Sequence, residues 1–310
     1  MLLRYVLQRM LGLIPVLLFV ALLTFTLMHL APGGPWDQAS AEGRELPPEV
    51  LANLNTRYGL DRPLPLQFVA YLGGLLHGDL GPSFSNPGDS VQELLGQGLG
   101  VTVQLGLLAG AVAVLLGVPL GVLAALRHNT LLDHLAMLLA IAAFTTPPFV
   151  LSLFLIVLFA VRLPLLPPGG WETPSARILP VLVLAAGPTA VLARYTRASV
   201  LDVITQDYIR TARAKGLRER TVVLRHLLRG ALLPVLTILG PVMAGLVTGS
   251  FVVETVFRVP GVGRLFVDAV FARDYPLIMG TTLLYAVAIV VANLIVDVLY
   301  AVIDPRIAYA

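Results

Sequence analysis

Cysteine is absent from this 310-residue sequence, and lysine occurs once, at Lys215. The missing cysteine excludes disulfide bonds and thiolate metal sites. Charge is scarce as well, because Asp, Glu, Lys and Arg make up 13% of the residues, against roughly 25% in soluble domains. Hydrophobic residues make up 57%. The composition therefore disfavours the two soluble domains that length alone would suggest, and it favours a membrane protein.

Catalytic and nucleotide-binding motifs are also missing. The histidines form neither HExxH nor another metal-ligand spacing, and no Gly-x-Ser-x-Gly elbow occurs. His128 and His134 flank a short turn, where we expect both to be solvated. A P-loop needs Ser or Thr after its lysine, but Gly216 follows Lys215. We therefore expect a protein without catalytic residues, without a metal site and without a cofactor, and any ATP should bind to another subunit.

Long charge-free runs predict six membrane-spanning helices, because about 20 mostly apolar residues cross a bilayer. The expected spans are residues 9–31, 100–126, 134–162, 178–199, 230–252 and 277–302. Pro147-Pro148 and Gly187-Pro188 interrupt backbone hydrogen bonds in the third and fourth spans. The first run is too long for a signal peptide and no convincing cleavage site follows it, so we expect it to stay as a helix.

The distribution of arginine predicts the orientation, since cytoplasmic flanks of membrane spans are enriched in Arg and Lys. Arg4 and Arg9 precede the first span, and residues 194–229 form a second basic stretch. An even number of spans puts both stretches, and both termini, in the cytoplasm. We therefore expect a multi-pass protein of the cytoplasmic (inner) membrane whose basic groups meet lipid rather than nucleic acid.

Two segments are expected on the outer side. In the first, residues 32–99, short amphipathic helices are predicted over 48–58 and 66–77, separated by Gly and Pro turns. We interpret this segment as a small ordered subdomain, with a flexible loop as the alternative. The second segment, residues 253–276, is predicted to turn at Pro260 and Gly261 and to form a helix over 264–272.

The basic stretch also has a helical pattern. Apolar residues recur at helical spacing over 200–215, which predicts one amphipathic helix. Gly216 is placed to end it in a left-handed conformation, and a second helix is expected from about 218 into the fifth span at Leu233-Pro234. The arginines alone could be topological anchors. The helix–glycine–helix geometry instead favours a rigid elbow to which another protein docks.

Three polar residues in or near the spans are candidates for gating or for the transport pathway. Asn293 and Asp297 lie four residues apart, on one face of the last span, and Glu254 lies at the outer end of the fifth. Ionisable residues inside a membrane are functional candidates by default. A solvated or helix-bonded Asp297 and a structural Glu254 are the alternatives.

Motifs along the whole chain resemble the permease subunits of ATP-binding-cassette importers of the dipeptide/oligopeptide/nickel class, and most closely the first of the two permease subunits. The markers, in order, are RYVLQRMLGLIPVLL, HLAPG, YGLDRPLPLQF, HGDLG, TRASVLDVITQDYIRTARAKGL, LRHLLRGALLPVLT, VVETVFRVPGVGRLFVDAVFARDYP and NLIVDVLYAVIDPRI. The resemblance implies an all-α, type I permease bundle of six transmembrane helices with an extracellular or periplasmic insertion after the first span. The expected parts are residues 1–31, the insertion 32–99, a permease core 100–303 and a cytoplasmic tail 304–310.

The resemblance also implies a function and a set of partners. The implied function is import of peptides by alternating access. Nickel chelates, glutathione or oligosaccharides are alternative cargoes, and a non-ATP secondary transporter or a scaffold is the alternative class. The implied partners are a second homologous permease subunit, two cytoplasmic ATPase subunits that bind ATP and Mg, an external substrate-binding protein and the lipid bilayer.

A coupling helix that docks the ATPase is implied by the same resemblance. It corresponds to Asp207, Tyr208, Ile209, Arg210, Thr211, Ala212, Arg213, Ala214, Lys215 and Gly216. The family's Glu-Ala-Ala signature is replaced here by Arg210, Thr211 and Ala212. The family's glutamate contact with a basic residue of the ATPase cannot form in the same way. We therefore expect Arg210, together with Arg213, to face the ATPase.

Overall fold

The computed structural model describes residues 2–37, 47–86 and 88–303, so the predicted tail 304–310 lies outside the described residues. The described residues divide into two compact units, one formed by residues within 2–101 and 260–291, the other by residues 102–259 and 292–303. Within the described ranges every regular element is a helix, apart from one isolated bridge between Pro82 and Ser90.

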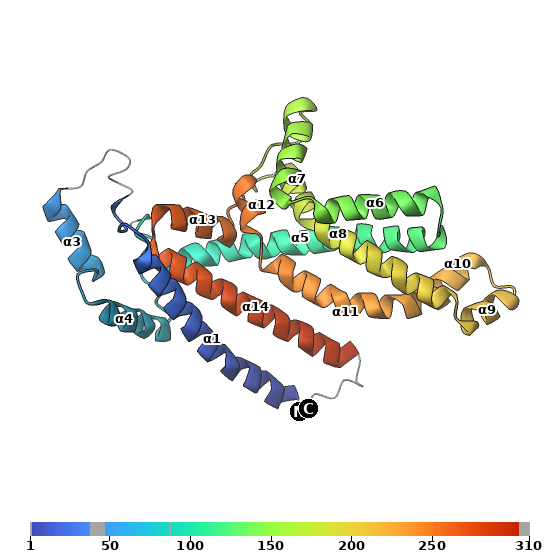
Figure 1. The fold of residues 1–310 in the computed structure, drawn as a ribbon, viewed down its shortest axis with the longest axis horizontal. Helices are drawn as coiled ribbons and strands as arrows, with labels where there is room; N and C mark the ends of the chain where they lie inside the picture. The colour runs from blue at the N-terminus through green and yellow to red at the C-terminus, as the bar shows by residue number, and fades with distance from the viewer. Residues whose placement is uncertain (1, 38–46, 87, 304–310) are drawn as a thin grey trace. The chain divides into compact units, whose positions relative to one another are not determined.

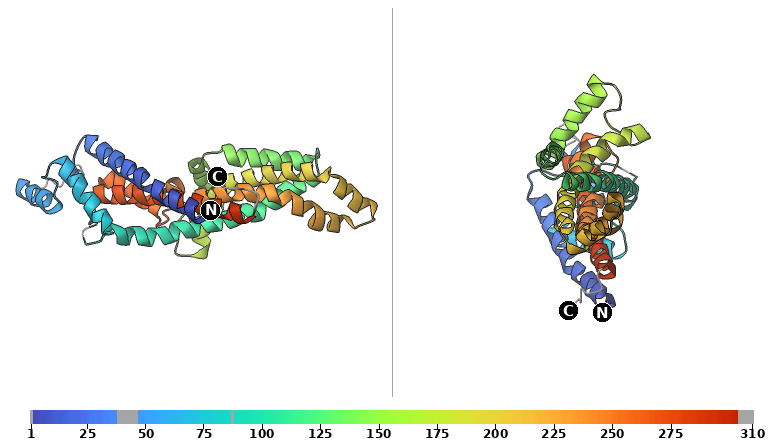
Figure 2. Two further views of the ribbon diagram at one scale, coloured as in Figure 1. Left: turned by 90° about the horizontal axis from the view of Figure 1, so that it is seen from below. Right: turned by 90° about the vertical axis from the view of Figure 1, so that its right-hand side faces the viewer.

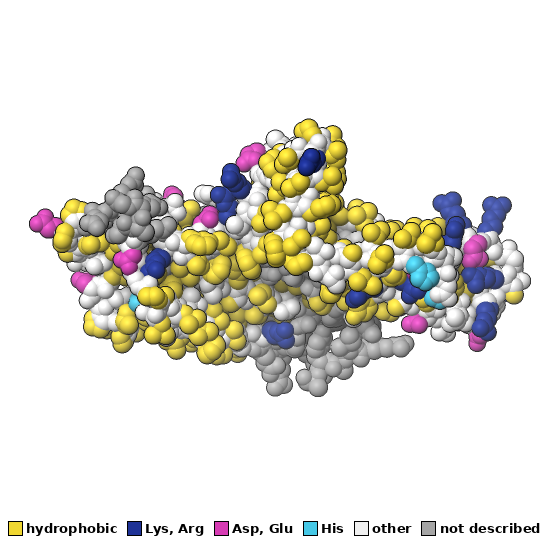
Figure 3. Space-filling view, turned by 45° about the horizontal axis from the view of Figure 1, so that its top comes forward, with side chains coloured by type: hydrophobic (Ala, Val, Ile, Leu, Met, Phe, Trp, Pro, Cys, Tyr) yellow, Lys and Arg dark blue, Asp and Glu magenta, His cyan; other side chains and the backbone are white. Residues whose placement is uncertain are grey.

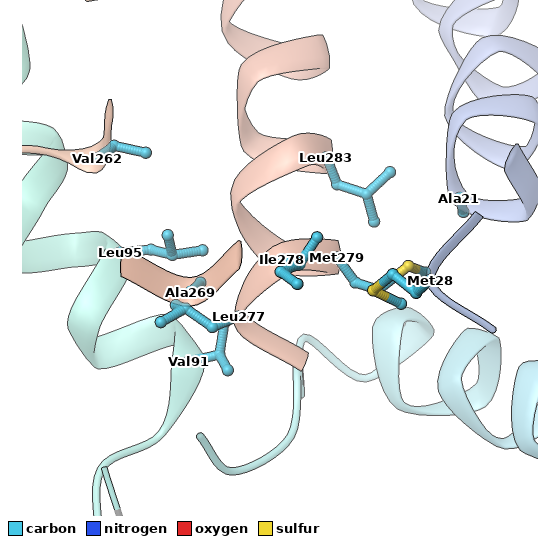
Figure 4. Close-up of a cluster of buried hydrophobic side chains, with 10 residues drawn as sticks. All are labelled: Ala21, Met28, Val91, Leu95, Val262, Ala269, Leu277, Ile278, Met279 and Leu283. Atoms are coloured by element: carbon cyan, nitrogen blue, oxygen red, sulfur yellow. The ribbon is translucent and has the colours of Figure 1, made fainter. Parts of the chain in front are cut away.

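The first unit contains the first predicted span, the described part of the first outer segment and residues 260–276 of the second (Figure 1). Its helices are α1 (Leu2–Leu30), α3 (Pro48–Tyr58), α4 (Leu64–Leu76), the start of α5 (Val91–Leu126), α13 (Val262–Ala272) and the start of α14 (Tyr275–Ile303). The short helices predicted in the outer segments are confirmed as α3, α4 and α13. Figure 4 shows the buried cluster of the first unit, which includes Met28, Leu95, Leu277 and Met279.

The second unit holds the remaining helices (Figure 2). These are α6 (Leu131–Thr145), α7 (Pro148–Leu155), the π-helical segment η1 (Ile156–Arg162), α8 (Pro174–Ile204), α9 (Asp207–Ala214), α10 (Glu219–Thr221), the π-helical segment η2 (Val222–Leu227), α11 (Leu228–Val247) and α12 (Phe251–Val256). The remaining parts of α5 and α14 also belong to this unit.

Five described helices are long and apolar enough to cross a membrane, and a bent pair gives a possible sixth span. The third predicted span, 134–162, is interrupted at its two prolines, because Leu131–Thr145 and Pro148–Arg162 meet at an angle of 108°. Pro147 is extended, with φ at −56° and ψ at 140°, and two consecutive prolines remove two backbone donors. Pro188, which has no proline beside it, lies inside the continuous helix α8.

Glycines bring α5 close to its neighbours in the second unit. A Cβ built on Gly117 would lie 2.7 Å from the carbonyl oxygen of Thr189, and one on Gly121 would collide with the carbonyl oxygen of Ala193. Small residues four apart allow helix backbones to approach in membranes. α5 therefore packs directly on the backbone of α8.

The exposed surface is dominated by hydrophobic side chains (Figure 3). Arg and Lys instead gather over α9 and α10. Large exposed apolar areas are rare on soluble proteins and mark surfaces covered by protein or lipid. The pattern is that of lipid-facing helices with one strongly basic, water-exposed end in the second unit.

Candidate functional site

The predicted docking elbow is present, but it is built from two helices where we expected one. α8 runs to Ile204, and α9 begins at Asp207. Between them Gln206 is extended, with ψ at 148°, and Thr205 Oγ1 donates to the carbonyl of Asp202 at 3.0 Å. The prediction of a single helix over 200–215 is therefore wrong, and α9 is a separate short helix.

Gly216 ends α9 as the sequence predicted. Its φ of +75° is left-handed, and its N–H donates to the Arg213 carbonyl at 2.9 Å. The Leu217 N–H reaches back to the Ala212 carbonyl at 3.4 Å. These two bonds are the 5→2 and 6→1 pair of a Schellman motif, which satisfies the last carbonyls of a helix. The chain then turns toward α10 and α11.

Two residues of α9 fix it to the second unit. Ile209 and Ala212 are buried in a cluster with Val200 of α8, Val222 of η2 and Ala231 of α11. Val200 and Ile209 thus meet in one cluster although they belong to different helices. This shared cluster explains why the helical spacing of apolar residues continues across the break at Thr205.

The other face of α9 is exposed and carries the charges. Arg213 Nη2 lies 2.7 Å from Glu219 Oε1, and this hydrogen bond raises the pKa of the Arg213 guanidinium. Arg210 Nη1 lies 3.8 Å from Asp207 Oδ1, and both side chains are largely exposed. Exposed pairs contribute little energy, so Arg210 is available to a partner, and Arg213 is available too but has a closer competing carboxylate on its own chain.

The remaining members of the predicted coupling helix are all exposed. Tyr208, Thr211, Ala214 and Lys215 are exposed. The Tyr208 hydroxyl would lie 2.7 Å from a Cβ on Gly230, so Tyr208 reaches back over the start of α11. α9 therefore presents one exposed face, with Arg210 at its centre.

Glu254 is fully buried in α12, with no exposed surface. The hydroxyl of Thr102, itself 1% exposed, donates to Glu254 Oε1 at 3.2 Å. A Cβ on Gly249 would lie 2.7 Å from the same oxygen. The carboxylate thus joins α12 to α5 in a tight site, which favours the structural alternative for this residue.

The other pathway candidates lie on α14. Asn293 is half-buried, and the side chain of Asp297 lies outside the described residues. An apolar cavity of about 270 Å³ runs beside this part of α14, lined by residues that include Leu239, Met243 and Val296. Asn293 is not among the residues that line this cavity.

An ion pair that the sequence did not indicate joins α6 and α8. Arg197 Nε lies 2.6 Å from Asp133 Oδ1, and Arg197 Nη2 lies 2.8 Å from Asp133 Oδ2. Asp133 is 2% exposed, and it also accepts the Asn129 N–H at 3.0 Å. His128 Nδ1 lies 3.3 Å from Asp133 Oδ2, and the His128 side chain is half-exposed. His128 therefore contacts Asp133 as well as solvent.

A buried carboxylate in the first unit also accepts several hydrogen bonds. Asp274, fully buried before α14, accepts hydrogen bonds from the hydroxyls of Ser83 and Ser85 at 2.5 and 2.7 Å. It also accepts the Leu277 N–H at 3.2 Å. These hydrogen bonds join residues that are 189 to 191 positions apart, so no local sequence pattern predicts them.

Among the residues that the structure describes, no cluster of three His, Cys, Asp or Glu could hold a metal ion.

The fold and the elbow indicate the class of protein: a helical, multi-pass membrane protein with an exposed helix–glycine–helix elbow. Residues 2–100 match the family described as "Binding-prot-dependent transport system membrane comp, N-term". Residues 117–309 match "Binding-protein-dependent transport system inner membrane component". The chain belongs to this family of inner-membrane transport permeases.

Named relatives match over nearly their whole length. The dipeptide transport system permease protein DppB of Bacillus subtilis is 44% identical over 98% of this chain and 97% of its own. The oligopeptide transport system permease protein OppB of Escherichia coli is 44% identical over 99% and 100%. The glutathione transport system permease protein GsiC of Pectobacterium atrosepticum is 45% identical over 99% of both chains.

Solved structures share the fold. The MetNI methionine ABC transporter in an inward-facing conformation matches with a TM-score of 0.58 and 19% identity, over 69% of this chain and 97% of that one. An amino acid ABC transporter matches with a TM-score of 0.52 and 19% identity, over 67% and 93%. The predicted all-α permease fold is confirmed.

Proposed function

We propose that this chain is a transmembrane subunit of an ATP-driven importer that moves peptides across the cytoplasmic membrane by alternating access. The observation that carries the proposal is 44% identity, over nearly the full length, to permeases named for dipeptides and for oligopeptides. A second permease subunit, two ATPase subunits that bind ATP and Mg, and an external binding protein complete the machine. The chain supplies the pathway and no ATPase site.

α9 is the docking element for the ATPase. Its exposed face carries Arg210, and its buried face is fixed by Ile209 and Ala212 to the core that also holds α8 and α11. A displacement of α9 would therefore also move the end of α8 and the start of α11. Arg210 meets a carboxylate on the ATPase, in place of the contact that the family's glutamate makes.

The α9 side of the membrane is the cytoplasm, together with both termini, because nine basic residues lie within residues 194–229. The sequence contains no cysteine, so Lys215→Cys gives a single thiol at an exposed position. We expect a membrane-impermeant maleimide to label it only after cells are permeabilised. Labelling in intact cells would reverse the proposed orientation.

Peptide import is tested in cells of the source organism that lack this gene. Uptake of a labelled dipeptide should be lost, should return with the wild-type gene, and should be inhibited by vanadate rather than by a protonophore. With Arg210→Glu we expect roughly 10–100-fold lower uptake, since a hydrogen bond to a charged group contributes about 1.5–3 kcal/mol. Arg220→Glu, an exposed charge reversal in α10, is the matched control.

Unchanged dipeptide uptake in the deletion strain would contradict the peptide assignment. Glutathione is the second candidate, because the identity to a permease named for glutathione is equally high. A strain that loses uptake of labelled glutathione but keeps that of dipeptides would favour it. If a protonophore alone stops uptake, the ATP-driven class itself is wrong.

A further inference from the structure

We propose that α4 is a membrane-interface helix, which inserts its exposed face into the leaflet where α1 ends and places Arg57 and Arg62 at the level of the phospholipid phosphates. The inference requires only that α1 crosses the bilayer. It does not depend on which substrate is carried, so it can fail or succeed independently of the proposed function.

The composition of α4 is that of a helix solvated by lipid. Its sequence, LPLQFVAYLGGLL, contains no charged residue. With 13 residues it is about 20 Å long at roughly 1.5 Å per residue, too short for a hydrocarbon core about 30 Å thick. An apolar helix of this length is buried in a core or lies in a membrane interface.

One face of α4 is already occupied by protein. Phe68, Tyr71 and Leu75 lie on it and pack against the buried cluster of the first unit, which includes Met28 of α1. The Phe25 and Phe68 rings lie 5.2 Å apart. α4 is therefore held beside the last turns of α1, where that span leaves the hydrocarbon.

The opposite face is apolar and uncovered. Leu66 is 57% exposed, Val69 is 62% exposed and Leu76 is 87% exposed. At 100° per residue these three side chains group together, away from Phe68 and Leu75. A helix that is apolar on all sides needs an apolar surrounding on all sides. α1 likewise exposes apolar side chains, such as Leu27 at 58% exposure.

Basic and aromatic residues adjoin this surface. A cavity of about 390 Å³ lies between α1, α4 and the end of α3, and its lining includes Met28, Ala70, Arg57 and Arg62. Neither arginine forms an ion pair with any residue that the structure describes. Asp79 also lines the cavity, but it accepts the Gly81 N–H at 2.8 Å.

The lining and the charge of this cavity suit part of one phospholipid. Its apolar wall accommodates the upper part of an acyl chain, and the two guanidinium groups match a headgroup phosphate in charge and hydrogen-bond geometry. Arg57 lies over the Tyr58 ring, 5.9 Å from its centroid, and interfacial tyrosines favour the headgroup level. An anionic lipid is therefore the expected occupant.

The absence of cysteine permits a direct test of the insertion. Single-cysteine variants Leu66→Cys and Val69→Cys carry a nitroxide in the assembled transporter, reconstituted in vesicles of equal parts phosphatidylcholine and phosphatidylglycerol. We expect relaxation by oxygen to exceed relaxation by a water-soluble nickel chelate at both sites. Ala52→Cys, on the exposed face of α3, is the matched control and should show the reverse. Labels at Leu66 and Val69 that behave like the control would overturn the proposal.

Two further outcomes are decisive. If the labels on α4 are water-exposed in vesicles and become protected only when a binding protein is added, the face is a protein-docking surface and the lipid proposal is wrong. The double variant Arg57→Gln/Arg62→Gln should retain several-fold less phosphatidylglycerol than wild type when bound lipid is measured by mass spectrometry. If the double variant retains as much phosphatidylglycerol as wild type, Arg57 and Arg62 do not bind the lipid phosphate and that part of the proposal is wrong.

Discussion

Replacing Gly216 with proline is expected to reduce substrate uptake to the level of cells that lack the gene, while the chain still enters the membrane. Gly216 has a φ of +75°, and its N–H donates to the Arg213 carbonyl at 2.9 Å. Proline fixes φ near −65° and has no N–H, so it meets neither requirement. The turn that ends α9 would open, and α9 would no longer move as one body with α8 and α11.

Graded variants separate this effect from general misfolding. Gly216→Asn should keep most of the uptake, since asparagine tolerates the left-handed region. Gly78→Pro makes the same change in the outer segment, at a φ of +76°. It should not alter the coupling of ATP hydrolysis to uptake. Membrane content is measured by immunoblot, and normal uptake in Gly216→Pro at wild-type abundance would contradict the role of α9.

Local patterns in the sequence predicted most of the helices. Charge-free runs identified the membrane spans, since the length of an apolar run is itself the physical requirement for crossing a bilayer. Glycine at 216 identified the end of α9, because a left-handed φ has a local cause. The helices α3, α4 and α13 followed from short periodic segments between turns in the same way.

The direction of the chain at breaks was not predictable in this way. Pro147-Pro148 indicated lost hydrogen bonds, but the 108° bend also depends on where α7 packs. Near Thr205, an unbroken apolar period concealed a break, since Val200 and Ile209 reach one cluster from two helices. Periodicity reports which side chains are buried, and it does not report whether one helix or two present them.

The polar contacts were the least predictable part of the candidate site. Asp133 and Arg197 are 64 residues apart, and no local pattern pairs them. The pairing of Arg213 with Glu219 was not predicted either, although Arg213 lies on the exposed face of α9. The sequence shows which charged residues lie near the elbow, but only the folded backbone shows which of them pair with one another.

The Asp133–Arg197 pair should be the most costly of the described ion pairs to break. Arg197 binds both oxygens of Asp133, and the two side chains are 24% and 3% exposed. Removing one partner of a buried pair costs about 3–5 kcal/mol, because a charge is left without compensation. We therefore expect Asp133→Ala to lower the unfolding midpoint of the purified transporter markedly. Asp268→Ala, which breaks the exposed pair with Arg264, should change the free energy of unfolding by at most about 1 kcal/mol.

A double variant tests whether the loss comes from the orphaned charge. In Asp133→Leu/Arg197→Met both charges are gone, and well-packed apolar pairs often replace buried ion pairs at little cost. Most of the lost stability should return, except for the contribution of the Asn129 N–H that Asp133 accepts. If the double variant is as unstable as Asp133→Ala, the carboxylate acts mainly by ordering the turn before α6. If Asp133→Ala is no less stable than Asp268→Ala, the pair does not hold α6 on α8.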